Sequence, residues 1–269
     1  MNVLVLGSEG LIGNALLQNL KFNTAGLEFS PKQSLVEKKA VLEGVIRAEK
    51  PNVIINCIGS FSNIFFRDLE VNAILSEMIL ETINASNFNI QTFLIGSAAE
   101  YGNIDGPVSE DERLEPSSMY GLSKKIQFEI CEFYRKKYKM KINYLRPFNI
   151  AGHTLNRNLL IGEINFQLQQ NKESNSKKFN FGDLSGYRDY LDIKKFAYII
   201  ERLIETEIED YTLNIASGKG IEVREFVKQT IEKNGIINPE INEKKAVSDK
   251  SYKSVLADVT KLKKLIGEI

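Results

Sequence analysis

The chain has 269 residues, of which 43% are hydrophobic and 26% are charged, the ordinary composition of a soluble globular protein. Basic and acidic residues number 35 each, so no overall charge draws the chain to nucleic acid or to a membrane surface. Two cysteines and one histidine exclude a disulfide framework and a histidine-based zinc site, and we expect no metal.

The opening residues, MNVLVLG, lack the basic region and the long apolar core of a signal peptide. No apolar run reaches the roughly 18–20 residues that a membrane-spanning helix needs. We therefore expect a cytoplasmic protein that does not contact the membrane.

Strand-like and helix-like segments alternate over the first half of the chain. Short apolar runs ending at glycine or proline are typical of buried parallel strands, and apolar residues at helical spacing predict helices. The expected strands are 2–7, 25–29, 52–59, 91–97 and 141–147. The expected helices are 10–20, 35–50, 67–86 and 118–138. This alternation predicts an α/β fold with a Rossmann-type, doubly wound parallel sheet.

After Pro147 the pattern changes. Residues 164–178 run from a helix into a polar tract that we expect to be a mobile loop, and 179–193 indicate loop and short strands. The later expected elements are a helix at 194–206, a strand at 211–218, a helix at 223–235 and a final helix at the chain end. We expect a dinucleotide-binding domain at 1–150, with elements of about 186–218 added back, and a smaller mixed α/β substrate region at 151–269.

The segment GSEGLIG, residues 7–13, follows the first strand and opens the first helix. Gly7 permits a tight turn, Gly10 lets backbone approach a pyrophosphate, and Gly13 permits close packing of helix and strand. The helix start, with Leu11 and Ile12, offers free N–H groups to phosphates. The alternative is a glycine turn of some other α/β protein, but the flanking strand and helix favour a dinucleotide site.

Glu28 ends the second strand, about 20 residues past Gly7, where an acidic residue accepts hydrogen bonds from the adenosine ribose and repels a 2′-phosphate. This favours NAD over NADP. Lys32 could instead meet the 2′-phosphate of NADP, and Glu28 could be an ordinary exposed glutamate.

Tyr120 and Lys124 lie four positions apart in MYGLSKK, so a helix directs both to one face. A nearby cation favours the phenolate, and we expect Lys124 to lower the tyrosine pKa toward neutrality, which makes the phenol a usable acid or base. Without the glycine turn, such a pair is more often surface decoration on a helix.

Ser97 ends an expected strand in IGSAAEYG, and ligands of doubly wound sheets bind at the carboxyl ends of strands. Its hydroxyl is therefore placed to bond a substrate carbonyl. The alternative is a serine that caps a helix or a turn.

Together these segments resemble the extended short-chain dehydrogenase/reductase family, also described as the NAD-dependent epimerase/dehydratase family. The matching pieces, in order, are GSEGLIG, NCIGS, EVNAILS, GSAAEYG, PVSEDERLEPSSMYGLSK, RPFNIAG, GYRDYLDI, YTLNIASG and ADVTKLKKLIG. The match is greatest to nucleotide-sugar enzymes that reduce 4-keto-6-deoxyhexoses, such as GDP-4-keto-6-deoxymannose reductase.

The resemblance implies the following roles. Ser97, Tyr120 and Lys124 are implied to be catalytic, with Tyr120 as general acid, Lys124 at the nicotinamide ribose and Ser97 at the reacting carbonyl. Cofactor contacts are implied for Gly7, Gly10, Leu11, Ile12, Gly13, Glu28, Cys57, Ile58, Gly59, Tyr120, Lys124 and Pro147. Ser97, Asn149 and Arg188 are implied to bind the nucleotide-sugar, and Asn72 to be a structural tie on its helix.

Some positions depart from the family pattern. Ala98 and Ala99 stand where the sugar 4,6-dehydratases carry an acid-base carboxylate, which disfavours dehydration. Ser248 replaces a second phosphate-binding arginine, with Lys250 and Lys253 nearby. The third strand near residues 30–35 is shortened.

The resemblance implies an enzyme that uses NAD(H) or NADP(H) to reduce a nucleotide-linked 4-keto-6-deoxyhexose at C4. The alternatives are a nucleotide-sugar 4-epimerase with the same residues, or a non-catalytic protein that senses a dinucleotide. The resemblance also implies a homodimer joined by the 67–86 and 118–138 helices.

Overall fold

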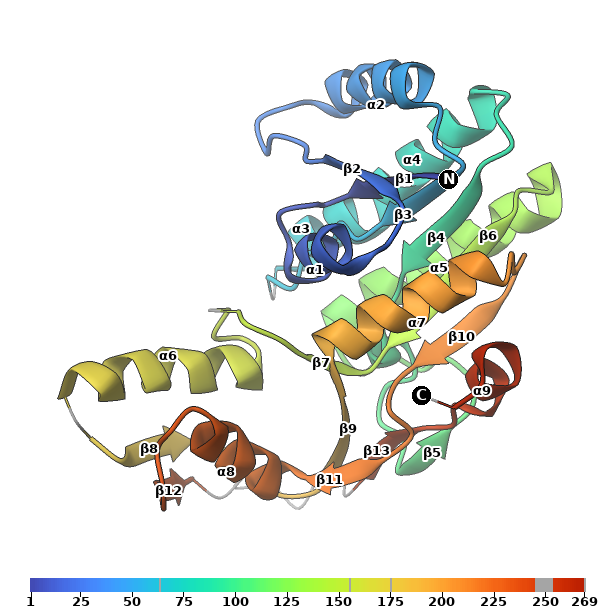
Figure 1. The fold of residues 1–269 in the computed structure, drawn as a ribbon. Helices are drawn as coiled ribbons and strands as arrows, with labels where there is room; N and C mark the ends of the chain where they lie inside the picture. The colour runs from blue at the N-terminus through green and yellow to red at the C-terminus, as the bar shows by residue number, and fades with distance from the viewer. Residues whose placement is uncertain (63, 155, 175, 245–253, 269) are drawn as a thin grey trace.

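The computed structural model describes residues 1–62, 64–154, 156–174, 176–244 and 254–268. Within these ranges the central sheet has six strands in the order β10-β6-β4-β3-β1-β2, all parallel to their neighbours. The strands are β1 (Asn2–Leu6), β2 (Asn23–Leu27), β3 (Val53–Asn56), β4 (Gln91–Ile95), β6 (Ile142–Pro147) and β10 (Thr212–Ile215). Figure 1 shows this sheet crossing the upper part of the molecule.

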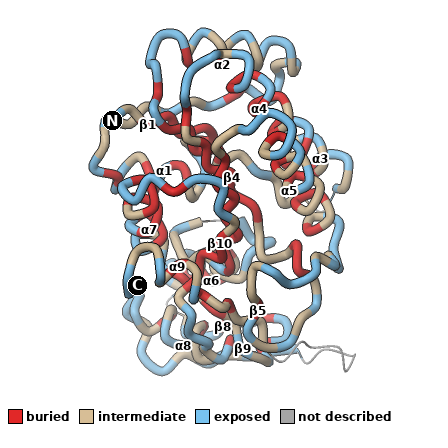
Figure 2. The backbone as a smooth tube through the Cα atoms, turned by 90° about the vertical axis from the view of Figure 1, so that its right-hand side faces the viewer, coloured by how far each residue is buried: buried red, intermediate tan, exposed pale blue. Residues whose placement is uncertain are grey.

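Helices cover both faces of the sheet, as the sequence predicts for a doubly wound fold. They are α1 (Leu11–Asn19), α2 (Leu35–Glu49), α4 (Leu75–Ala85), α5 (Met119–Tyr138) and α7 (Ile193–Glu205). Alternate residues of one strand enter different layers, since Val3 packs with the α1 and α7 side and Leu4 with the α2 and α4 side. The buried residues accordingly form a continuous band through the sheet (Figure 2).

The strand order places a ligand crevice at β1. β2 lies on one side of β1 and β3 on the other, so the crossover helices diverge at the carboxyl ends of β1 and β3. Ligands of doubly wound sheets bind at this switch point. In the described part of the chain no strand stands between β2 and α2, consistent with the shortened third strand.

The predicted helix 67–86 is continuous but not uniformly α-helical. It comprises α3 (Phe65–Leu69), a π-helical turn η1 (Glu70–Ile74) and α4. Hydrophobic spacing could not reveal the wider turn, because a single π turn hardly disturbs the apolar pattern. Such turns occur frequently at functional sites.

Short strands beside the main sheet form a second layer around β9 (Tyr187–Asp192), which pairs with β7 (Asn149–Ala151), β11 (Gly220–Glu222) and β13 (Ser254–Ala257). The remaining elements are η2 (Ala98–Glu100), β5 (Gly106–Val108), α6 (Leu160–Ser174), β8 (Lys178–Phe181), α8 (Val223–Lys233), β12 (Glu240–Glu243) and α9 (Thr260–Ile266). Most of these elements come from the second half of the chain, whereas η2 and β5 come from the first half.

The helix expected at the start of 164–178 is present, but most of the polar tract expected to be a mobile loop is also helical. Helix α6 extends to Ser174, because Leu168 is buried and the Gln167 and Asn171 amides donate to the backbone oxygens of Asn180 and Lys178 in β8. Polar side chains thus anchor the helix where apolar ones are few.

No helix in the described ranges is long and apolar enough to cross a bilayer. The same residues contain no group of three or more potential metal-binding side chains.

Candidate functional site

The glycine-rich turn adopts a backbone conformation that glycine permits and other residues rarely adopt. Gly7 has φ +76°, and its N–H donates to the Leu27 oxygen at 2.9 Å. A Cβ on Gly13 would lie 2.1 Å from the Gly7 oxygen, so only glycine lets α1 pack this closely. Gly10 caps α1 without a side chain, which leaves no side-chain cap over the N–H groups at Leu11 and Ile12.

Glu28 lies beside the same turn. Its exposed carboxylate accepts a hydrogen bond of 3.2 Å from the Glu9 backbone N–H, inside the glycine-rich segment. Glu28 therefore stands at the mouth of the crevice, where a ribose bound to this turn would meet it. Lys32 is also exposed, and only its backbone N–H contacts Ser30.

The loop after β3 closes the other side of the crevice. The Cys57 N–H donates to the Leu6 oxygen at 2.9 Å, and the Ile58 N–H donates to the Asn56 side chain at 3.1 Å. Gly59 lies close to both Asn72 and Lys124, since a Cβ there would be 3.6 Å from the lysine Nζ. Burial raises the pKa of the Cys57 thiol, and the nearby Lys124 opposes this rise.

Two buried residues of the α3–η1 segment hold that loop. Asn72 accepts from the Ser60 N–H at 2.8 Å and donates to the Ser60 oxygen at 2.9 Å, which confirms it as a structural tie. Asp68 Oδ1 accepts from the Ser60 hydroxyl and from the Ser62 N–H and hydroxyl at 2.8–2.9 Å. Asp68 Oδ2 is buried without a hydrogen-bond partner among the described residues. The loop carrying Phe61 is thus fixed at both of its serines.

Ser97 caps a turn and also faces Tyr120. Its hydroxyl accepts from the Ala99 N–H at 3.1 Å, and its own N–H donates to Glu100 Oε1 at 2.8 Å, a capping box at η2. The Ser97 side chain is also close enough to the Tyr120 phenol to lower its pKa. The turn residue and the candidate catalytic residue are therefore the same serine.

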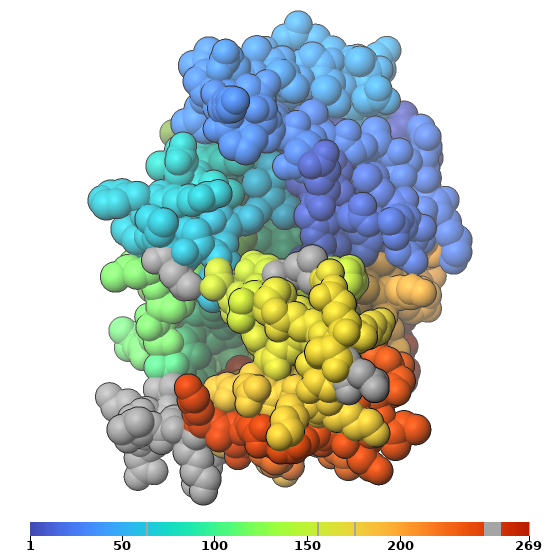
Figure 3. Space-filling model, turned by 90° about the vertical axis from the view of Figure 1, so that its left-hand side faces the viewer, coloured from blue at the N-terminus to red at the C-terminus, as the bar shows by residue number. Residues whose placement is uncertain are grey.

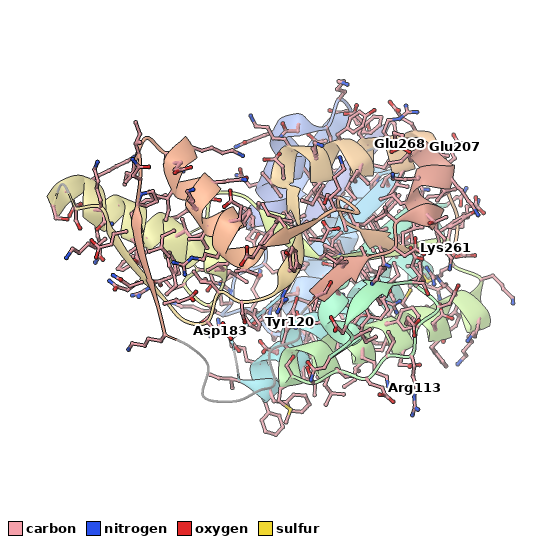
Figure 4. All side chains as sticks on the ribbon, turned by 90° about the horizontal axis from the view of Figure 1, so that it is seen from below. Arg113, Tyr120, Asp183, Glu207, Lys261 and Glu268 are labelled. Carbon is pink, nitrogen blue, oxygen red and sulfur yellow. The ribbon has the colours of Figure 1, made fainter. Side chains whose placement is uncertain are left out.

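Tyr120 is the second residue of α5, is half-buried and is labelled near the centre of the view in Figure 4. Burial raises its pKa to about 12, while the hydrogen bond with Ser97 lowers it and Glu100 and Asp68 raise it further. The expectation that Lys124 brings this pKa toward neutrality is wrong for this structure. The lysine is not among the groups that shift it, because the ammonium is bound elsewhere.

Lys124 is buried one turn deeper in α5. Its Nζ donates to the Ile95 oxygen at 2.8 Å and to Gln127 Oε1 at 3.0 Å. Burial lowers its pKa to about 8, and Glu100, Cys57 and Asp68 oppose that decrease. The sequence placed Lys124 on the right helix face but did not indicate Gln127 as its partner.

A buried ion pair behind Ser97 escaped the sequence analysis. Arg146 Nε donates to Glu100 Oε2 at 2.8 Å, and both side chains are at most 1% exposed. The Tyr144 hydroxyl donates to Glu100 Oε1, also at 2.8 Å. Because Glu100 also accepts from the Ser97 N–H, the ion pair anchors the serine turn. The only sequence signal was two charges within apolar segments.

The three remaining predicted residues lie in β6, β7 and β9. Pro147 ends β6 and is buried at the carboxyl edge of the sheet. The Asn149 amide donates to the Asp189 oxygen at 2.9 Å, so it links β7 to β9. Arg188 is half-buried in β9, and its guanidinium donates to the Tyr187 oxygen and lies near Asp183. Ser248, Lys250 and Lys253 lie outside the described residues.

Figure 3 shows a hollow between the yellow residues of α6 and the cyan and green residues of α3 and α5. The glycine turn, the uncapped start of α1 and Glu28 fit the phosphates and ribose of a dinucleotide. Gly59, Tyr120 and Lys124 fit its nicotinamide end, since Gly59 leaves the Lys124 Nζ uncovered by a side chain.

A family of known proteins matches most of the chain. The family model described as GDP-mannose 4,6 dehydratase matches residues 36–265. A GDP-6-deoxy-D-talose 4-dehydrogenase of Aggregatibacter actinomycetemcomitans is 28% identical over 236 residues, covering 83% of this chain and 76% of that protein.

Two solved structures have the same fold. RMD from Pseudomonas aeruginosa complexed with NADPH superimposes with a TM-score of 0.84 at 21% identity, over 99% of this chain and 92% of its own. UDP-glucose 4-epimerase with UDP-glucose from Thermotoga maritima gives a TM-score of 0.83 at 22% identity, over 100% of this chain and 93% of its own.

Proposed function

The chain belongs to the GDP-mannose 4,6-dehydratase family, and we propose that it reduces a nucleotide-linked 4-keto-6-deoxyhexose at C4. The members of the family that it matches are NAD-dependent nucleotide-sugar enzymes of the extended short-chain dehydrogenase/reductase type. The observation that carries this proposal is the position of Ser97, close enough to the Tyr120 phenol to lower its pKa, with Lys124 one helical turn away on α5. A non-catalytic dinucleotide sensor has no need of this arrangement.

The chain's own residues account for the proton and for the charge. A nicotinamide dinucleotide bound at the glycine turn supplies the hydride. The Tyr120 hydroxyl donates the proton to the oxygen at sugar C4, and the Ser97 hydroxyl stabilises the negative charge developing there. A pKa of about 12 keeps the phenol protonated near neutral pH, which suits a general acid. Lys124 binds the nicotinamide ribose.

Dehydration, the reaction in the family's name, lacks its acid-base group here. Ala98 and Ala99 follow Ser97, and alanine transfers no proton. Glu100 does not replace the missing carboxylate, because it is fully buried and bound to Arg146, Tyr144 and the Ser97 N–H. This absence supports reduction over dehydration.

A 4-epimerase is the second candidate. The Thermotoga maritima epimerase matches the fold nearly as well as the Pseudomonas aeruginosa protein. Epimerisation would use Ser97, Tyr120 and Lys124 for oxidation followed by reduction, so the two reactions differ in cofactor release and not in these residues.

For the cofactor we propose NAD(H) over NADP(H), supported by the Glu28 carboxylate at the glycine turn. For the substrate we propose that Asn149 and Arg188 bind the nucleotide-sugar. Arg188 would contact the diphosphate, because its planar guanidinium matches phosphate oxygens.

We also propose a homodimer through α3, α4 and α5. Exposed apolar side chains lie along α3, the π turn and α5: Phe66, Ile74, Met119, Phe133 and Tyr138. Apolar residues gathered on neighbouring helices are typical of association surfaces. A monomer in sedimentation velocity at micromolar concentration would contradict this.

The test is turnover of GDP-, dTDP-, UDP- and CDP-linked 4-keto-6-deoxyhexoses with NADH and with NADPH. A reductase consumes cofactor and keto sugar in equal amounts, measured as loss of absorbance at 340 nm. An epimerase instead interconverts nucleotide hexoses without net cofactor consumption. Tyr120→Phe should lower kcat at least 100-fold without impairing cofactor binding. Unchanged turnover in this variant would exclude Tyr120 as the general acid.

A further inference from the structure

Gln127 connects the candidate catalytic lysine to the neighbouring helix. It lies three residues after Lys124 in α5 and is fully buried. Its Oε1 accepts from Lys124 Nζ at 3.0 Å, and its Nε2 donates to the Ser76 hydroxyl oxygen in α4 at 2.8 Å. The buried Gln127 amide thus joins a buried cation to a neutral hydroxyl, which indicates a role beyond packing.

Building on the proposed function, we propose that Gln127 is a positioning residue that holds the Lys124 ammonium and directs its remaining N–H toward the nicotinamide ribose. The third acceptor at Lys124 is thus the cofactor, while the protein supplies the other two.

The hydrogen bonds of Ser76 determine which way the amide points. The Ser76 hydroxyl donates its only proton to the Asn72 oxygen at 2.8 Å, so its oxygen can only accept from Gln127 and from Asn56. A flipped amide would place its oxygen against an acceptor and its NH2 against an ammonium. The carbonyl oxygen of Gln127 must therefore face Lys124.

The number of N–H donors on Lys124 also explains why its protonation affects cofactor binding. An ammonium has three N–H donors, and Ile95 and Gln127 accept two of them. A neutral amine keeps two N–H groups, which the same two acceptors would still hold. Deprotonation therefore removes the donor that is available to the ribose, and cofactor affinity should fall as Lys124 loses its proton.

Several groups around Lys124 affect this proton. Glu100 from η2, Asp68 from α3 and Cys57 from the loop after β3 raise the lysine pKa, while burial lowers it to about 8. Tyr120 stands one turn away on the same helix. Gln127 contributes a neutral hydrogen-bond acceptor. Exchanging it for glutamate therefore adds a negative charge beside the Lys124 ammonium.

The experiment measures NADH and NADPH binding by cofactor fluorescence from pH 6 to pH 10, without any sugar. For the cofactor that binds, affinity should fall with a midpoint near pH 8. In Gln127→Met the affinity should fall about tenfold at pH 7, and the midpoint should move to lower pH. In Gln127→Glu the midpoint should move up by at least one pH unit, because a carboxylate beside the ammonium stabilises its protonated form.

Gln229→Met and Gln229→Glu serve as controls, since Gln229 is exposed on α8 and contacts only Glu225 among the described residues. Thermal unfolding shows whether each variant folds. If Gln127→Met does not fold, Gln127→Glu alone tests the proposal. Opposite shifts in the two Gln127 variants support the proposal. A purely structural role would lower stability and leave the midpoint of Gln127→Glu unchanged, which overturns it.

The outcomes also separate this inference from the proposed function. If wild type binds cofactor with the expected pH dependence but turns over no keto sugar, the proposed function fails and the role of Gln127 stands. If wild type turns over substrate and neither midpoint moves, only the role of Gln127 fails. If wild type binds neither cofactor, both are wrong.

Discussion

The Phe61 ring lies edge-on against the ring of Tyr120, with centroids 4.8 Å apart and planes at 69°. The loop that carries Phe61 cannot easily move, because Asp68 and Asn72 bind the serines on either side of it. Phe61 therefore restricts the movement of the Tyr120 ring. Together with burial, this contact determines where the phenol points.

Phe61→Ala should reduce kcat/KM about 2- to 10-fold, because an edge-to-face aromatic pair contributes roughly 0.5–1.5 kcal/mol beyond its area. Water admitted beside Tyr120 should also lower the pKa of the phenol from about 12. Steady-state kinetics and ultraviolet titration of the tyrosine measure the two effects. Phe88→Ala is the matched control, because the Phe88 ring is exposed and lies just after the end of α4. Equal losses in both variants would refute a specific role for Phe61.

Glu28→Ala should weaken NADH binding about tenfold and leave NADPH binding unchanged or stronger. We propose that the carboxylate beside the glycine turn accepts hydrogen bonds from the ribose hydroxyls and repels a 2′-phosphate. Titration with both reduced cofactors measures the ratio, with Glu43→Ala on the outer face of α2 as control. A parallel loss for both cofactors would show that Glu28 supports only the turn.

Arg146→Met should lower the free energy of unfolding by about 3–5 kcal/mol, because it leaves the buried Glu100 carboxylate without its cation. The double variant Glu100→Gln with Arg146→Met should recover part of this loss. Urea denaturation measures both, and Arg202→Met, in an exposed ion pair of α7, should change stability by less than about 1 kcal/mol. Additive effects of the two buried substitutions would contradict the ion pair as a unit.

The pH dependence of stability should report Lys124. Its pKa is about 8 in the folded chain and 10.5 as the ordinary value, so between these pH values the unfolded chain holds a proton that the folded chain does not. Stability of the wild type should therefore rise relative to Lys124→Met as the pH increases from 8 to about 10, by at most about 1.4 kcal/mol per pH unit.

Chemical denaturation at pH 7, 8, 9 and 10 measures this difference. Lys228→Met, on the exposed side of α8, should give a curve parallel to the wild type throughout. If the stability curve of Lys124→Met is also parallel to that of the wild type, folding does not lower the pKa of Lys124.

Much of the fold could be predicted from local patterns. The apolar runs ending at Gly7 and Gly59 and the helical periodicity between them predicted a doubly wound sheet, which the strand order confirms. The polar segment 164–178 misled, because side-chain hydrogen bonds to β8 support α6 there. Such bonds join elements distant in sequence and leave no periodicity.

The sequence by itself determined which residues share a turn or a helix face: the glycine turn at 7–13, and Tyr120 with Lys124 on α5. Only the tertiary structure decided which groups surround them, namely Gln127 and Ser76 at the lysine, Glu100 and Arg146 behind Ser97, and Phe61 at the tyrosine. The reason is physical. Spacing along one element is set by backbone geometry, whereas hydrogen bonds and pKa values depend on burial and on partners that other elements bring within about 3 Å.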